Sequence, residues 1–137
     1  MLISKRKIQV FIILFVSTIT LTSFTNYRSI HVKFNNKTGE DIESLVIAGT
    51  PIGSLKNGSS TKYIDFKSFL FDGKDPYEQI SGFINNLKVS QLNYSWCGTE
   101  RNRKSKGSYV FDLKKEVDEN GTISLYLTRH NEEIILK

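Results

Sequence analysis

The chain has 137 residues, of which 39% are hydrophobic and 12% aromatic, and its formal net charge is +5. This length excludes two independent cores, and the composition is too apolar for a disordered chain. Of the 19 Lys and Arg, three precede residue 24, so 16 cations against 14 acids leave only +2 for the rest, which does not argue for a nucleic-acid partner.

The first residues have the layout of an export signal. Lys5, Arg6 and Lys7 precede a run without charge from Ile8 to Phe24, and the end of this run is rich in Thr and Ser. A basic stretch followed by an apolar run is typical of a secretory signal. The alternative is an uncleaved membrane anchor, although the run is at the short end of what spans a bilayer. No Cys lies near its end to carry a lipid.

We therefore expect residues 1–24 to be a secretory signal or an N-terminal membrane anchor, residues 25–28 a linker, residues 29–130 one domain and residues 131–137 a tail. The protein would be periplasmic or extracellular if the leader is cleaved, and membrane-anchored if it is not. We interpret the leader and the composition as bacterial, which indicates the cell envelope. Because Cys97 is the only cysteine, an internal disulfide is excluded, and packing and hydrogen bonds must hold the domain together.

Two strands are predicted in the first part of the domain. Residues 29–34 alternate between apolar and polar side chains, as in a half-buried strand, and turn-forming residues follow them. Residues 42–49 are more apolar throughout, which indicates a central strand. Residues 50–60 contain Pro, Gly and an Asn-Gly pair, which predicts a bent connection ending in a tight turn.

The middle of the domain is expected to hold two more strands. Residues 61–71 predict a third strand that bends near Ser68, and residues 72–76 contain the turn that stops it. Residues 77–84 predict a fourth strand, in which Gly82 indicates a bulge or a close approach of two backbones.

Three strands are predicted in the last part. Asn85 and Asn86 form a turn into a fifth strand at residues 87–96. After a basic loop, residues 108–115 and 122–129 predict a sixth and a seventh strand with an Asn-Gly turn between them. We expect the fifth and sixth strands to pair as a hairpin around the basic loop.

Seven short strands at a spacing of roughly ten residues predict an all-β fold, namely a single antiparallel β-sandwich. A small β-barrel is the alternative, because it satisfies the same strand pattern. The architecture is immunoglobulin-like in strand number, but the paired cysteines of that arrangement are absent and no family is assigned. The predicted core consists of Ile30, Val32, Phe34, Leu45, Ile47, Ile64, Phe66, Ile80, Ile84, Tyr109, Phe111, Leu113, Ile123, Leu125 and Leu127.

Catalytic signals are sparse. A nucleophilic Cys97 would need a base such as His31 or His130, and nothing in the sequence places either beside it. A thiol shielded behind Trp96 is the simpler interpretation, and a thiol-dependent enzyme or redox protein is the alternative function. We assign no catalytic residue and no cofactor.

No metal site is predicted either, because the two His and the Cys are isolated from one another in the sequence. Asp72, Asp75 and Glu78 resemble part of an oxygen-ligand loop, but they lack the acid spacing of a calcium site. Turn formation accounts for this stretch without a metal.

Residues 100–107, the basic segment, are the candidate binding site, because exposed loops often carry binding residues. Clustered cations could contact an anionic protein, glycan or lipid headgroup, with aromatic residues adding a stacking surface. The alternative is a solvated hairpin tip that only aids solubility. We expect the loop from Cys97 to Ser108 to be exposed and mobile and Trp96 to be buried. The candidate binding residues are Tyr94, Trp96, Arg101, Arg103, Lys104 and Lys106.

Four Asn-x-Ser/Thr triplets begin at Asn36, Asn57, Asn93 and Asn120, and they would accept glycans only in a eukaryotic secretory route. Taken together, the sequence predicts a small exported, non-enzymatic binding or accessory module with an unknown ligand.

Overall fold

The computed structural model describes residues 5–10, 12, 28–93 and 100–130. Residues 5–10 are helical, and no helix within these ranges is long and apolar enough to cross a membrane. The body that follows residue 28 is built from strands, so the predicted all-β class is confirmed.

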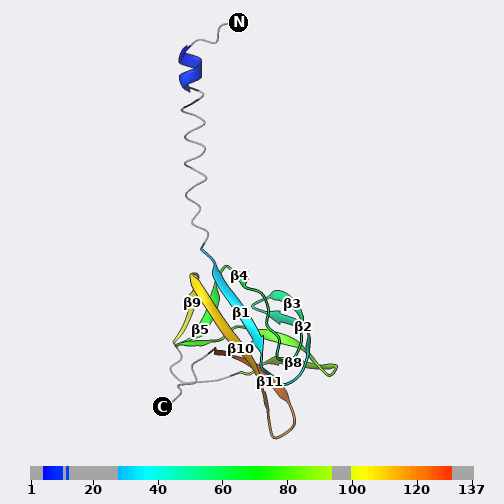
Figure 1. The fold of residues 1–137 in the computed structure, drawn as a ribbon. Coiled ribbons are helices and arrows are strands. Elements are labelled where there is room, and N and C mark those ends of the chain that lie inside the picture. Colours follow the sequence, from blue (N-terminus) through cyan, green and yellow to red (C-terminus); the bar gives the residue numbers. More distant parts are fainter. Residues whose placement is uncertain (1–4, 11, 13–27, 94–99, 131–137) are drawn as a thin grey trace, which may run out of the picture.

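The described body contains two sheets (Figure 1). The large sheet has eight strands in the order β3-β2-β7-β8-β11-β10-β1-β4, and the small sheet has three in the order β6-β5-β9. The strands are β1 (Ile30–Asn36), β2 (Ile42–Ile47), β3 (Thr50–Leu55), β4 (Ile64–Phe66), β5 (Phe69–Asp72), β6 (Asp75–Pro76), β7 (Ile80–Ile84), β8 (Leu87–Gln91), β9 (Arg101–Lys104), β10 (Gly107–Val117) and β11 (Ile123–Arg129).

Three predicted segments differ from the structure. Residues 50–55 form the edge strand β3 rather than a connection, and an edge position tolerates Pro51 and Gly53 because one side of the strand needs no partner. The predicted third strand breaks after Phe66 into β4 and β5, which belong to different sheets. Part of the basic segment is not a loop but strand β9.

The prediction of a wholly antiparallel sheet is wrong, because β1 pairs in parallel with β10 and β8 in parallel with β11. The predicted hairpin between the fifth and sixth strands is also wrong. β8 pairs with β7 and β11, and β10 pairs with β1 and β11. Strand periodicity identifies which residues share a face, but it does not identify a partner that is distant in the sequence.

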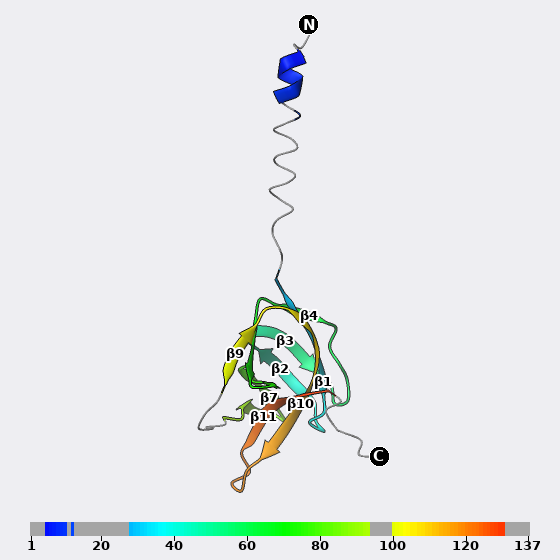
Figure 2. The ribbon, with the colours of Figure 1, turned by 90° about the vertical axis from the view of Figure 1, so that its left-hand side faces the viewer.

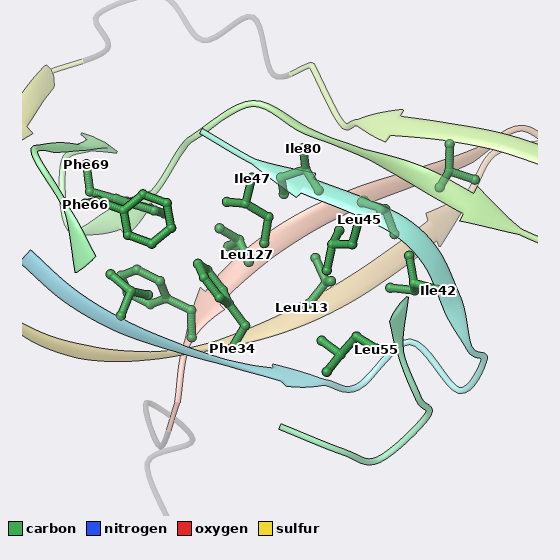
Figure 3. Close-up of a cluster of buried hydrophobic side chains, with 14 of the residues drawn as sticks. Phe34, Ile42, Leu45, Ile47, Leu55, Phe66, Phe69, Ile80, Leu113 and Leu127 are labelled. Atoms are coloured by element: carbon green, nitrogen blue, oxygen red, sulfur yellow. The ribbon is translucent and has the colours of Figure 1, made fainter. Parts of the chain in front are cut away.

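Both sheets contribute to one apolar core, shown in Figure 3. Phe69 of the small sheet contacts Phe111 and Phe34 of the large sheet, with ring centroids 5.4 and 6.3 Å apart. Among the described residues, every buried member of this core lies between Ile30 and Leu127 and belongs to one cluster, so we expect the body to fold on its own.

The predicted core agrees closely with this cluster, since every predicted residue is buried or partly buried against it. Ile64, Tyr109 and Ile123 are the partly buried ones. Five further core residues were not predicted, namely Ile42, Leu55, Phe69, Phe71 and Val89.

Asn36 joins two distant parts of the curled large sheet, which Figure 2 shows from the side. Its side chain is fully buried, and Nδ2 donates hydrogen bonds to Leu55 O at the end of β3 and to Glu40 O, over 2.9 and 2.8 Å. Oδ1 accepts hydrogen bonds from the backbone and the hydroxyl group of Thr38. Because the amide nitrogen is buried and bonded, the folded body cannot present Asn36 as a glycan acceptor.

Candidate functional site

The basic segment forms one edge of the small sheet. Strand β9 pairs with β5 in an antiparallel register that places Arg103 opposite Leu70 and Arg101 opposite Asp72. Side chains alternate between the two faces along a strand, so Arg101 and Arg103 lie on one face of the small sheet and Lys104 lies on the other. This alternation gives the cations of the segment different surroundings.

Arg103 is paired within the molecule. Its Nη1 donates a hydrogen bond to Glu78 Oε1 over 2.9 Å, and the Glu78 side chain is only 6% exposed. The same carboxylate oxygen accepts the backbone N–H of Leu70 over 2.8 Å. A buried carboxylate needs such partners, so Arg103 has a structural role in holding β9 on β5.

Arg101 also has partners inside the body. Its Nε lies 3.8 Å from Asp72 Oδ2, and its guanidinium lies 4.6 Å from the centre of the Tyr77 ring. Both the opposite charge and the ring face attract this cation. Its capacity to bind an external anion is reduced accordingly.

Lys104 lies on the other face of β9, against the aromatic end of the core. Its Nζ is 4.5 Å from the centre of the Phe71 ring and 5.8 Å from that of Tyr109. Arg129, from the end of β11, lies 5.9 and 5.8 Å from the centres of the same two rings. Lys104 and Arg129 thus border the rings of Phe71 and Tyr109, and the apolar parts of their side chains cover this edge of the core.

Lys106 differs from the other cations of the segment. It is exposed, and within the described part of the chain it has neither an ion pair nor a ring contact. It therefore carries the charge that the segment presents most freely to solvent. Tyr94 and Trp96, the predicted aromatic binding residues, lie outside the described residues, and so does Cys97.

The two His do not come together. His31 Nδ1 is hydrogen-bonded to Asp65 across β1 and β4. His130 Nδ1 is hydrogen-bonded to Asp112, and it lies 3.4 Å from Asn35 Nδ2. Asn35 is four residues along β1 from His31, or about 13 Å for an extended strand.

Each His therefore has an oriented ring, but among the described residues no hydroxyl group is hydrogen-bonded to either one. General-base activation of a nucleophile requires such a contact or a bridging water. The alternative role of Cys97 stays untested, because this residue is not among those described.

Asp112 belongs to a polar network that the sequence did not reveal. Asn35 Nδ2 donates to Asp112 over 2.8 Å, and Ser60 Oγ donates to Asn35 Oδ1 over 2.7 Å. Burial raises the pKa of Asp112, but the hydrogen bonds from Asn35 and His130, with the nearby charge of Lys37, lower it more. The net result is a pKa below the ordinary value, so this carboxylate is charged at neutral pH.

The acidic turn does not assemble a ligand set. Asp72 and Glu78 form ion pairs with Arg101 and Arg103, respectively, as described above. Among the described residues, no group of three or more His, Cys, Asp or Glu is placed to hold a metal ion.

No protein-family model matches the chain, and no curated protein matches it. One solved structure is similar, "NMR structure of the protein from Eubacterium rectale", at 15% sequence identity and a TM-score of 0.44. The match covers 80% of this chain and 97% of that one. A likeness at this level carries no argument about function.

Proposed function

We propose that this chain is a small exported module of a bacterial cell envelope that binds an anionic partner and catalyses no reaction. The observation that carries the proposal is the apolar run from Ile8 to Phe24 after three cations, followed by a β body whose basic segment presents Lys106 to solvent. The basic segment is the binding element, and Lys106 is its most available charge. The leader places the body outside the cytoplasm, whether it is removed or retained as an anchor.

Cell fractionation of the full chain tests export. The native chain is expected in the periplasmic, membrane or extracellular fraction of a bacterial host, whereas Leu14→Arg with Phe15→Arg interrupts the apolar run and should keep the chain in the cytoplasm. The proposal of export is wrong if the native chain and this variant fractionate alike.

Binding is tested on an immobilised anionic polymer, dextran sulfate. Lys106→Gln should elute at a lower salt concentration than the native body, while Lys74→Gln, an exposed lysine in the β5–β6 turn, serves as the control. Equal shifts for the two variants would show that only net charge matters and would remove the basic segment as the binding element.

We further propose that the two sheets form the layers of an open sandwich rather than a closed barrel. The contacts of Phe69 with Phe34 and Phe111 across the sheets support this arrangement. In a sandwich the outer backbone N–H groups of β3 are unpaired and should exchange with solvent rapidly. Slow hydrogen exchange there would favour the barrel.

A further inference from the structure

Three exposed cations from separate parts of the sequence meet at one end of the body. β1 lies between β10 and β4, and Ile30 is in register with both Gly107 and Phe66. Neighbouring strands are about 5 Å apart, so these three positions span roughly 10 Å. The shared end is also where β1 and β10 begin (Figure 1).

The strand directions bring the cations together. β1 and β10 are parallel, so Arg28 and Lys106, which precede Ile30 and Gly107, extend beyond the same end. β4 is antiparallel to β1, so Lys67, which follows Phe66, extends beyond that end too. The hydrogen bond from Arg103 Nη1 to Ser68 Oγ, 3.4 Å long, connects β9 to the same corner. We call Arg28, Lys67 and Lys106 the leader-proximal patch.

The patch has little internal neutralisation. All three residues are exposed, and in the described ranges none of them has an ion pair or a cation–π contact. The segments that meet at this end, residues 28–31, 64–69 and 103–110, contain one acid, Asp65, which is hydrogen-bonded to His31. The patch therefore projects positive potential into solvent.

The opposite end of β1 and β10 carries charges of both signs. Glu40 and Asp41, in the turn after β1, form ion pairs with Lys115 and Lys56. Among the described residues, the cations of the leader-proximal patch lack such partners, so an anionic surface is attracted more strongly to the leader-proximal end.

We propose that the leader-proximal patch docks the body on the anionic surface of a lipid bilayer. This inference rests on the proposed export, and it specifies the anionic partner as a membrane. Phe24, the last residue of the apolar run, and Arg28 are four positions apart, which is at most about 14 Å of chain. That reach is close to the distance of about 10 Å over which charges act at moderate salt. A leader inserted in a bilayer thus holds the patch within range of the headgroups.

Vesicle co-sedimentation of the body, residues 28–137, tests the inference without the leader. The probes are vesicles of phosphatidylcholine alone and vesicles of equal parts phosphatidylcholine and phosphatidylglycerol. The native body is expected to bind the mixed vesicles and not the neutral ones, and added salt should release it. The triple variant Arg28→Gln, Lys67→Gln, Lys106→Gln should bind roughly a hundredfold more weakly, because each cation near an anionic surface contributes about fivefold.

The matched control is Lys37→Gln, Lys74→Gln, Lys88→Gln, which removes the same charge from exposed positions elsewhere. It should keep most of the binding, and circular dichroism should show that both triple variants are folded. Equal losses in the two triple variants would overturn the inference, and so would a native body that ignores the mixed vesicles. Neither result would affect the fractionation test of export, so the proposed function could stand while the membrane partner is rejected.

Discussion

Arg103 and Glu78 form an ion pair that is exposed at one end and buried at the other. The Arg103 side chain is 55% exposed, whereas that of Glu78 is 6% exposed, and 2.9 Å separates the bonded atoms. The pair joins the edge strand β9 to the chain that follows β6. Part of the basic segment therefore contributes to the packing of the body, so a loss of binding after its removal would not by itself identify a binding site.

Arg103→Gln should lower the free energy of unfolding by about 1–3 kcal/mol, because it deprives a buried carboxylate of its charged partner. Urea denaturation measures the change. Lys106→Gln is the control, and as an exposed cation without a described partner it should stay within about 0.5 kcal/mol of the native value. If both variants lower the free energy of unfolding by the same small amount, the ion pair of Arg103 with Glu78 does not hold β9 in place.

Asn36→Ala should destabilise the body by at least about 2 kcal/mol, because it removes the hydrogen bonds that the buried Asn36 side chain makes to Leu55 O and to the backbone N–H of Thr38, whereas Glu40 O keeps its bond from the Thr38 hydroxyl group. Thermal or urea unfolding provides the measurement. Asn57→Ala, at an exposed position in the turn after β3, should have little effect. A similar stability for the two variants would mean that the junction of β1 and β3 does not depend on this side chain.

Acid should destabilise the body partly through Asp112. Its pKa is lowered in the folded state, so its contribution is present above the pKa of the unfolded chain, about 3.9, and is lost as the pH falls through the lower folded pKa. Unfolding free energies measured from pH 6 down to pH 2 should therefore fall less steeply in Asp112→Asn than in the native body. Parallel curves would show that the network with Asn35 and His130 does not favour the charged carboxylate.

Gly82→Ala should cost about 1–3 kcal/mol, which is typical of overpacking. A Cβ at this position would lie 3.0 Å from Ile42 Cγ2 and 3.2 Å from Glu43 O, so the predicted close approach at this glycine is confirmed. Ser81→Ala, on the neighbouring position of β7, is the control and should change stability much less. Equal unfolding midpoints for these variants would show that β2 can move away at no cost.

The sequence revealed local features better than distant ones. The alternation of apolar and polar residues identified β1, β10 and β11 together with most of their buried side chains, because this pattern can be recognised within a few consecutive residues. The edge strand β3 was missed because Pro51 and Gly53 resemble a connection, although both are tolerated where one side of a strand is open.

The candidate site was predictable only as a concentration of charge. The sequence shows that residues 100–107 are basic, but it does not show that Glu78 forms an ion pair with Arg103. It also does not show that Arg28 and Lys67 lie beside Lys106, because that proximity depends on the pairing of β1 with β10 and β4. The parallel pairing in particular has no signature in turn residues, since no short turn connects its strands.

The parallel pairing of β1 with β10 has a consequence for the order in which the body acquires structure. β1 is the first of the described strands to be synthesised, yet its long neighbour begins only at Gly107, and its other neighbour, β4, is three residues long. Contacts between segments so distant in the chain form late, because the intervening loop must close first. We therefore expect the nascent chain to stay unfolded until nearly all of it has been synthesised. For the export proposed above, such a delay would keep the chain extended while it crosses the membrane.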